Sequence, residues 1–324
     1  MTGKLAVVFG GSGFVGRNAV RELAKRGWRI RVAVRRPHHA QFLKPMGGVG
    51  QVQLVQANVR DRPSVQAAVQ GADAVINLVG ILHQEGAQKF ATVQAAGARA
   101  IAEAAAAEGV AQMIHVSAIG ANAQSDSLYA RSKGEAEQAV RAAMPNATIL
   151  RPSIVFGVED SFFNRFATMA LVSPALPLIG GGKTKYQPVY VDDVADAICE
   201  SLARPDAAGL TYELGGPEVY SFRELMTLML SETGQSRFLA PVPFPVASMI
   251  GAVGEIIGVA PFIDPPLTRD QVKLLKGDNV VAADAHKITD LGIAPQSIES
   301  ILPSYMVRFR KYGQFSEKTA ATED

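Results

Sequence analysis

The sequence predicts an α/β protein with a doubly wound parallel sheet and a smaller C-terminal α/β portion. Short apolar runs alternate five times with helical patterns before residue 120, and a glycine-rich turn follows the first run. After about residue 204 the pattern changes to short elements. Strands that alternate with amphipathic helices form parallel sheets, and a chain of 324 residues exceeds one average domain.

The first strand and the turn after it predict a dinucleotide site. Residues 5–9 are uninterruptedly apolar, which is typical of a strand buried on both faces, and a helical pattern follows the turn at once. Glycines in the turn let a pyrophosphate approach the backbone, and the N–H groups at the positive end of the helix face its phosphates. The alternative is a structural glycine turn that binds nothing. The predicted phosphate-binding residues are Gly10, Gly11, Ser12, Gly13, Phe14, Val15 and Gly16.

The end of the second strand predicts which nucleotide binds. Residues 28–34 alternate between apolar and polar side chains, and Arg35 and Arg36 follow them. A site for a ribose 2′-hydroxyl would have an acid here, about 20 residues beyond the glycines. A guanidinium instead binds a 2′-phosphate through two hydrogen bonds. We therefore predict NADPH (NADP) as the cofactor, the alternative being a solvated basic loop.

Three further strands are expected at residues 51–57, 72–79 and 112–117, with helices over 62–70 and 92–108 between them. Ligands of such sheets lie off the carboxyl ends of the strands. The cofactor-binding residues that we predict at these ends are Asn58, Val59, Leu78, Val79 and Gly80.

Ser117, Tyr129 and Lys133 form the constellation that has catalytic geometry. Ser117 ends the fifth strand, and Tyr129 and Lys133 stand four residues apart in a helical pattern, so they share a face. A lysine ammonium would lower the pKa of the phenol from about 10 and would hold ribose hydroxyls. These residues are conditional catalytic candidates and predicted cofactor contacts, the alternative being an exposed tyrosine and lysine on a surface helix. His115 is expected to be a core residue.

Composition narrows the function. A formal net charge of +2 without a basic arm does not favour nucleic acid as a partner. The single cysteine, Cys199, excludes an internal disulfide and fits a reducing compartment. The first strand begins at about residue 4, so we expect no signal peptide, and no apolar run is long enough to span a membrane. We expect no metal site.

The motifs together resemble the short-chain dehydrogenase/reductase superfamily in its extended or atypical branch. The matching segments are GGSGFVG at 10–16, Ser117, YARSK at 129–133, RPSIVFG at 151–157, QPVYVDDVADAI at 187–198 and YELGGPEVYSFREL at 212–225. The resemblance implies a Rossmann domain, places Pro152 and Ser153 beside the nicotinamide, and puts Asp192 and Asp193 at a strand-to-helix junction, where we expect an acid as N-cap.

A narrower resemblance extends nearly end to end. FFNRFATMA at 162–170, LPLIGGGKTKYQPVYV at 176–191, LTRDQVKLLKGDNVV at 267–281 and LPSYMVRFRKYG at 302–313 are similar to the NADPH-binding accessory subunit of respiratory complex I in its bacterial form. That resemblance implies tightly held NADPH outside the main electron path. It also implies contact with other subunits near the quinone site, at the junction of the peripheral and membrane arms, and a peripheral place on the cytoplasmic face of the inner membrane.

Gln94 separates this chain from many extended enzymes, which carry an asparagine three residues before the glycine corresponding to Gly97. This difference weakens the case for a proton relay through that position. We therefore expect a non-catalytic subunit whose bound NADPH supports assembly and stability. The alternatives are a free-standing NADPH-dependent reductase or epimerase and a nucleotide-sensing binding protein.

The expected organisation has three parts. They are a Rossmann NADP(H)-binding domain at 1–155 with a return segment at 187–204, a smaller partner-docking portion at 156–186 and 205–315, and a flexible tail at 316–324. The apolar helix at 246–259 is expected to be buried, to contact a protein or to lie on a membrane. Segments 241–266 and 303–311 are the candidates for contact with a membrane surface or lipid.

Overall fold

The computed structural model describes residues 3–257 and 267–315. The expected flexible tail at 316–324 and residues 258–266 of the expected membrane-contact segment lie outside the described residues. Within the described part of the chain, no helix has both the length and the apolar character that crossing a membrane requires.

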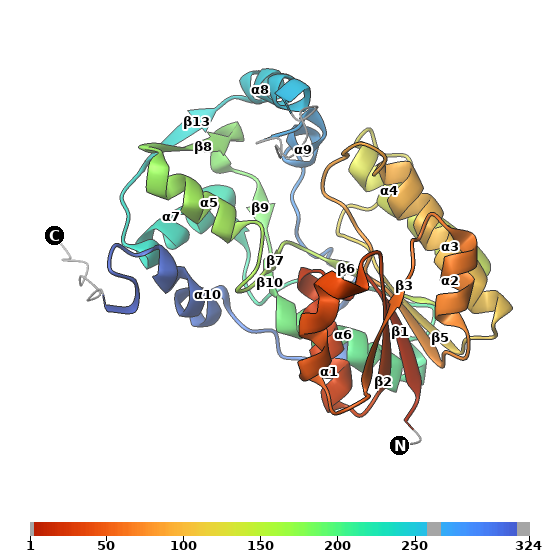
Figure 1. Ribbon diagram of the computed structural model, residues 1–324. Coiled ribbons are helices and arrows are strands. Elements are labelled where there is room, and N and C mark those ends of the chain that lie inside the picture. Colours follow the sequence, from red (N-terminus) through yellow and green to blue (C-terminus); the bar gives the residue numbers. More distant parts are fainter. Residues whose placement is uncertain (1–2, 258–266, 316–324) are drawn as a thin grey trace.

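An eight-stranded parallel sheet forms the centre of the molecule, as predicted (Figure 1). Its strands lie in the order β14-β11-β6-β5-β4-β1-β2-β3. The chain fills one side of β1 with β2 and β3 and then returns to the other side with β4, so the switch in direction lies beside β1. The strands are β1 (Leu5–Phe9), β2 (Arg29–Val34), β3 (Val52–Gln56), β4 (Ala74–Asn77), β5 (Gln112–Val116), β6 (Thr148–Pro152), β11 (Thr211–Leu214) and β14 (His286–Lys287).

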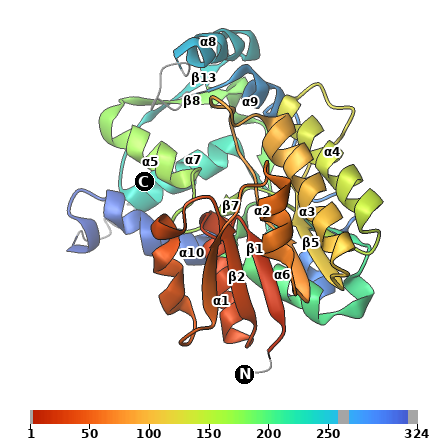
Figure 2. The ribbon, with the colours of Figure 1, turned by 45° about the vertical axis from the view of Figure 1, so that its right-hand side comes forward.

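Helices cover both faces of this sheet because its central strands are apolar on both faces (Figure 2). All five residues of β1 are buried. One face packs against α1 and α6, and the other against α2, α3 and α4. These helices are α1 (Phe14–Lys25), α2 (Arg62–Val69), α3 (Ala96–Ala107), α4 (Leu128–Ala143) and α6 (Val191–Ala203).

The alanine-rich helix expected over 92–108 begins with a π-helical turn at Ala91–Ala95 and continues as α3. Gln94 lies in that turn and is buried. Its amide donates to the Ile81 carbonyl at 2.6 Å and accepts the Ser132 hydroxyl at 2.7 Å. Gln94 therefore joins the loop after β4 to α4.

The smaller portion has its own core, drawn from residues 156–186 and 220–309. Asp160 organises it, since its carboxylate accepts the Tyr305 hydroxyl at 2.7 Å and the Phe163 N–H at 2.6 Å. Ser221 and Glu224 form a capping box at the start of α7. Its elements are β7 (Val155–Phe156), α5 (Phe163–Val172), β8 (Ala175–Ile179), β9 (Lys185–Tyr186), β10 (Val189–Tyr190), β12 (Tyr220–Ser221), α7 (Phe222–Thr233), β13 (Phe238–Val242), α8 (Phe244–Ile257), α9 (Arg269–Leu274) and α10 (Ile298–Met306).

Two strands differ from the expected organisation. β11 and β14 come from the range 205–315, which the sequence assigned to the smaller portion, yet they extend the large sheet beyond β6. Thr211 pairs with Ile149 and Tyr212 with Leu150. Strand pairing between residues about 60 apart depends on the topology and leaves no local pattern in the sequence.

The expected N-cap role of Asp192 and Asp193 is wrong. α6 begins directly after β10 with Tyr190 as its N-cap, so both acids fall inside the first turn. Asp192 instead pairs with Arg21 of α1 at 2.5 Å, and Asp193 accepts the Gln296 N–H at 2.8 Å.

The glycine run at Gly180–Gly182 forms a 3₁₀ turn. β8 before it pairs in parallel with β13, whereas β9 after it pairs with β12, so the two flanking strands do not pair with each other. Lys183 and Lys185 are exposed, as expected.

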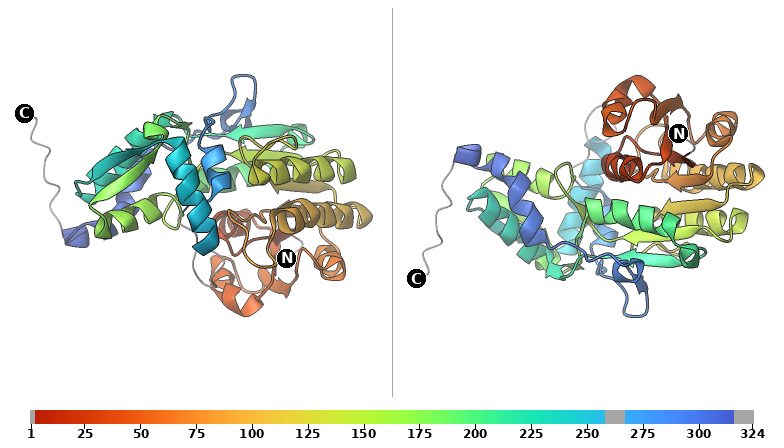
Figure 3. Two further views of the ribbon diagram at one scale, coloured as in Figure 1. Left: turned by 90° about the horizontal axis from the view of Figure 1, so that it is seen from above. Right: turned by 90° about the horizontal axis from the view of Figure 1, so that it is seen from below.

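The exposure of α8 tests whether the apolar helix expected at 246–259 is buried, contacts a protein or lies on a membrane. Ala247 is buried, but Val246, Met249 and Ile250 are 43%, 67% and 45% exposed. Complete burial is therefore wrong for the described part of this helix. In Figure 1 and in the left view of Figure 3, α8 and α9 lie between the smaller portion and α4.

The 303–311 segment has fewer free cations than its sequence suggests. Arg308 donates to the Val158 carbonyl at 2.9 Å, and Arg310 donates to the Glu232 carbonyl at 2.7 Å. Both guanidinium groups therefore hold α10 and the residues after it against the smaller core.

Polar side chains line the sheet face beneath α4. Glu137 of α4 accepts two hydrogen bonds from Arg151 of β6, at 2.9 and 2.6 Å. His115 is buried, as predicted, and its Nδ1 lies 3.1 Å from the Asn77 amide nitrogen. Burial, and then the charge of Lys133, lowers the pKa of His115 to about 3. His115 therefore stays neutral in the folded protein.

This burial predicts an acid-sensitive fold. Between pH 6.5 and pH 3 the unfolded chain binds a proton at position 115 that the folded chain does not bind, so stability falls as the pH falls. The loss approaches about 1.4 kcal/mol per pH unit for this group. We expect His115→Gln to flatten the acid limb of the free energy of unfolding, measured by urea denaturation from pH 7 to 4. His286→Gln, at an exposed position of β14, should leave the slope unchanged, and equal slopes for all three proteins would contradict the prediction.

Candidate dinucleotide site

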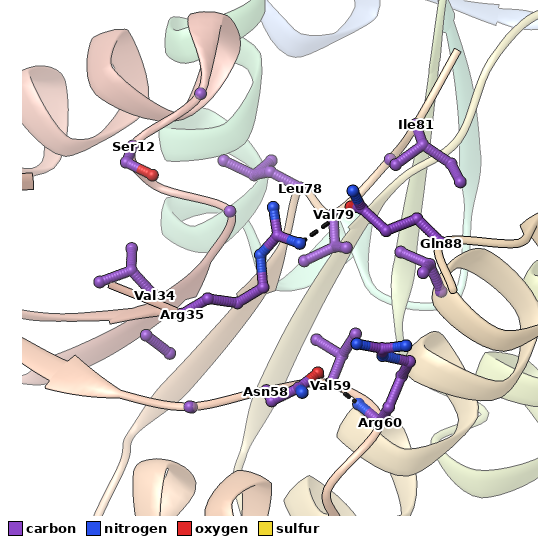
Figure 4. Close-up of a pocket in the computed structure, with 16 residues that line it drawn as sticks. Ser12, Val34, Arg35, Asn58, Val59, Arg60, Leu78, Val79, Ile81 and Gln88 are labelled. Carbon is purple, nitrogen blue, oxygen red and sulfur yellow. Dashed lines mark hydrogen bonds between the residues drawn. The ribbon is translucent and has the colours of Figure 1, made fainter. Parts of the chain in front are cut away.

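A cavity of about 250 Å³ lies at the carboxyl ends of β1 to β4, at the switch in strand order (Figure 4). This is where open parallel sheets bind ligands. Its lining residues are Gly10, Ser12, Gly13, Ala33, Val34, Arg35, Ala57, Asn58, Val59, Arg60, Leu78, Val79, Gly80, Ile81, Gln88 and Val93.

The glycine turn forms one wall through two close backbone approaches. Gly10 has φ +80°, and a Cβ there would lie 3.0 Å from the Leu78 carbonyl carbon. A Cβ at Gly16 would lie 2.2 Å from the Gly10 oxygen, so Gly16 lets α1 start against the turn. Only a glycine fits either position.

The N-terminus of α1 faces this turn and is suited to an anion. Gly13 is its N-cap, and within the described chain no side chain caps it. The first turn of α1 carries no acid. N–H groups at such an end are left for a ligand, and the helix dipole favours negative charge there. Gly11, Phe14, Val15 and Gly16 do not line the cavity; a Cβ at Gly11 would meet Val32 at 2.5 Å, so Gly11 serves packing.

Of the two predicted arginines, only Arg35 lines the cavity. Its Nη1 donates to Gln88 Oε1 at 2.9 Å. Arg36 is exposed and precedes the 3₁₀ turn at Pro37–Met46.

The sequence analysis missed a second guanidinium in this cavity, that of Arg60. Asn58 Oδ1 accepts the Arg60 N–H at 3.1 Å and so shapes the turn after β3. Arg60 Nη1 donates to the Ala87 carbonyl at 3.0 Å. The sequence held a signal for Arg60, because it follows the predicted contacts Asn58 and Val59. Ile81, Gln88 and Val93 had no such signal, because they come from the loop after β4 and the π turn.

Lys133, Ser117 and Tyr129 do not line the cavity, but Lys133 lies beside Gly80, which does. The Nζ of Lys133 donates to the Val116 carbonyl at 3.2 Å and lies 3.4 Å from the position of a Cβ on Gly80. Ser117 directly follows β5, and its buried Oγ has no hydrogen-bond partner among the described residues. A buried hydroxyl without a partner is the kind of group that a bound ligand satisfies.

The expected effect of Lys133 on Tyr129 is wrong. Burial raises the pKa of Tyr129 to about 12, and burial also lowers the pKa of Lys133 to about 8. The shared helix face places the two residues as predicted, but the lysine ammonium bonds to the end of β5, and the Tyr129 ring packs edge-on against Phe90 with centroids 5.8 Å apart.

Pro152 and Ser153 lie at the end of β6 and do not line the cavity. The Pro152 carbonyl accepts the Ile119 N–H at 3.1 Å. Ser153 Oγ lies 2.7 Å from Asn279 Oδ1 and 2.9 Å from the Asn279 carbonyl. The Ser153 hydroxyl therefore binds the C-terminal segment of the chain.

These features fit a dinucleotide. The glycine turn and the uncapped end of α1 suit a pyrophosphate, and the cavity between β2 and β4 suits an adenosine. The ammonium of Lys133 lies beside the lining residue Gly80.

The chain is similar to known proteins in sequence and in structure. Residues 6–215 match the model of the NAD dependent epimerase/dehydratase family. The mitochondrial NADH dehydrogenase [ubiquinone] 1 alpha subcomplex subunit 9 of Arabidopsis thaliana is 36% identical over 97% of this chain and 80% of its own length. A ceramide reductase of Caulobacter vibrioides is 33% identical over 77% of this chain and 77% of its own length.

Among solved structures, DesIV of Streptomyces venezuelae, a dTDP-glucose 4,6-dehydratase with NAD and TYD bound, has a TM-score of 0.69. It is 22% identical, and the match covers 94% of this chain and 96% of DesIV. The likeness to DesIV supports the fold, and the family match spans the sheet from β1 to β11, the glycine turn and the cavity. The chain therefore belongs to the NAD dependent epimerase/dehydratase family.

Proposed function

We propose that this protein is an accessory subunit of respiratory complex I that holds NADPH as a structural cofactor. The observation that carries the proposal is the 36% identity to the alpha subcomplex subunit 9 relative over 97% of the chain, which includes the last third as well as the nucleotide fold. The match to the ceramide reductase covers 77% of the chain. We further propose the bacterial form of this subunit, peripheral on the cytoplasmic face of the inner membrane and near the junction of the two arms.

The site chemistry supports a cofactor that is bound without turnover. A phenol with a pKa of about 12 is a poor acid or base at neutral pH. The buried amide of Gln94 takes the Ser132 hydroxyl and the Ile81 carbonyl, so it is already engaged. A tightly bound nucleotide would stabilise the loops around the cavity, by roughly 4 kcal/mol at a thousand times its dissociation constant.

The exposed apolar side chains of α8 support contact with a partner subunit or lipid. Val246, Met249 and Ile250 share the outer side of that helix, within the segment 241–266. The segment 303–311 is a weaker candidate because Arg308 and Arg310 bind their own chain. In this proposal, residues 1–155 and 187–204 bind the nucleotide, and residues 156–186 and 205–315 dock on the partner.

Reversing the charge at Arg35 tests the nucleotide. We expect Arg35→Asp to weaken NADPH binding at least about tenfold, because a charge-assisted hydrogen bond to phosphate is replaced by repulsion. NADH binding should change by less than about threefold, because NADH lacks the 2′-phosphate. Isothermal titration of the purified protein measures both affinities, and the amount of assembled complex in membranes should fall with NADPH occupancy.

Arg36→Asp is the matched control, since it changes the same charge one residue away from the cavity. It should leave the NADPH affinity within about threefold of the wild type. Equal losses in the two variants would contradict the assignment of Arg35. A variant that loses NADPH but still assembles into an active complex would contradict the structural role.

The partner proposal predicts what accompanies the protein out of the cell. A tagged copy expressed at native level should elute from detergent-solubilised membranes with subunits that carry flavin and iron–sulfur clusters. Absorption spectra and NADH:quinone activity of the eluate measure this. Elution of the chain alone from the soluble fraction would sink the proposal.

The second candidate function is a free-standing NADPH-dependent reductase or epimerase. The buried Ser117 hydroxyl has no partner among the described residues, and the similarity to a ceramide reductase also favours this function. If it is correct, NADPH is consumed with a carbonyl substrate, and Tyr129→Phe lowers the rate by at least about a hundredfold. We expect instead that neither the wild type nor Tyr129→Phe consumes NADPH with any of a panel of carbonyl compounds, as measured by absorbance at 340 nm.

A further inference from the structure

A tight turn reaches over the cavity from the loop after β4. Glu85 and Gln88 exchange two backbone hydrogen bonds, from Glu85 N–H to the Gln88 carbonyl at 3.1 Å and from Gln88 N–H to the Glu85 carbonyl at 2.7 Å. Gly86 between them has φ +49°. The backbone thus fixes the direction of the half-buried Gln88 side chain, which points into the cavity (Figure 4).

Two arginines hold this turn in different ways. Arg35, at the end of β2, binds the side-chain oxygen of Gln88 at 2.9 Å. Arg60, after β3, binds the backbone carbonyl of Ala87 at 3.0 Å. The contact of Arg60 survives any rotation of the Gln88 side chain, whereas the contact of Arg35 does not.

The two ligands of Arg35 would compete. Gln88 offers a neutral amide oxygen, and a nucleotide 2′-phosphate offers charged oxygens that bind a guanidinium with two parallel hydrogen bonds. Both bonds use the charged guanidinium, but the phosphate adds a second parallel hydrogen bond and an opposite charge. A phosphate at Arg35 would therefore displace the amide, while the bond from Arg60 keeps the turn in place.

We propose that Gln88 is a displaceable occupant of the 2′-phosphate position, and that residue 88 sets how strongly the protein prefers 2′-phosphorylated over unphosphorylated nucleotides. This inference rests on the proposed nucleotide site and adds the residue that tunes it. Gln88 acts through Arg35 and is a positioning residue.

The test uses adenosine 2′,5′-bisphosphate and adenosine 5′-monophosphate, which differ only in the 2′-phosphate. The measured quantity is the ratio of their dissociation constants, obtained by isothermal titration of the full chain. Gln88→Ala removes the competitor and should raise the preference for the bisphosphate about threefold to tenfold. Gln88→Glu, which has the same shape, should lower it at least about tenfold because its carboxylate holds Arg35 and repels the phosphate.

Two controls separate this role from a general effect. Gln84→Glu places the same added charge in the same loop, where the side chain accepts the Phe90 N–H, and should shift the preference by less than about twofold. In an Arg35→Ala background, Gln88→Ala should no longer change the preference, because there is no guanidinium to release. In every variant, the affinity for adenosine 5′-monophosphate should stay within about twofold of the wild-type value.

The outcomes distinguish the inference from the function on which it rests. Wild-type protein that binds neither nucleotide overturns the proposed site and the inference together. If the wild type binds the bisphosphate but Gln88→Ala weakens that binding, Gln88 is a ligand contact and the inference alone is wrong. An unchanged preference in both Gln88 variants, with melting temperatures that show folded protein, overturns it as well.

Discussion

The contact between Gly16 and the Gly10 carbonyl is the constraint on which the cavity depends. A Cβ at Gly16 would lie 2.2 Å from that oxygen, so α1 would have to leave the turn if any other residue stood there. Because the turn stays close, the N-terminus of α1 faces the switch point beside β1, where the loops after β2, β3 and β4 also end. Arg26, the C-cap of α1, pairs with Asp196 and Glu200 of α6, which fixes the helix along the sheet face. The backbone packing at Gly16 and the ion pairs of Arg26 thus hold the N-terminal end of α1 in the same position.

The last third of the chain is tied to the nucleotide-binding part through side chains that accept backbone donors. Asp270 of α9 accepts the Leu128 N–H at 2.7 Å and the Tyr129 N–H at 3.0 Å, and so caps the helix that carries Lys133. Glu213 of β11 accepts the Ala282 N–H at 2.9 Å, beside its pairing with Arg151 beneath α4. Partly buried charges of this kind are costly unless each has a partner, so the C-terminal segment completes the polar face of the sheet as well as forming its own core.

The local patterns of the sequence predicted the sheet, its order of strands and helices, and the glycine wall of the cavity, because each depends on neighbouring residues. The features that escaped prediction depend on residues far apart in the chain. β14 joins the large sheet through β11, Ser153 binds Asn279, and Arg60 enters the cavity because the loop after β4 lies above it. The pKa of Tyr129 was predicted in the wrong direction for a related reason. Helical spacing puts Lys133 on the same face, but it does not say that the ammonium reaches Val116 instead.

Tyr129, Lys133 and Gln94 bear on the proposal that the nucleotide is retained without turnover. A reductase of this fold needs a phenol that can give up or take a proton near neutral pH, yet burial puts the pKa of Tyr129 near 12 and that of Lys133 near 8. At pH 7 the lysine is therefore charged and the phenol is neutral, which suits binding of ribose oxygens better than proton transfer. Gln94 closes the remaining route, because its amide is satisfied by Ile81 and Ser132 within the π turn. Gln94 and Lys133 bond to the protein itself and so hold the loops near the cavity, whereas the buried Ser117 hydroxyl has no partner among the described residues and is available to a ligand.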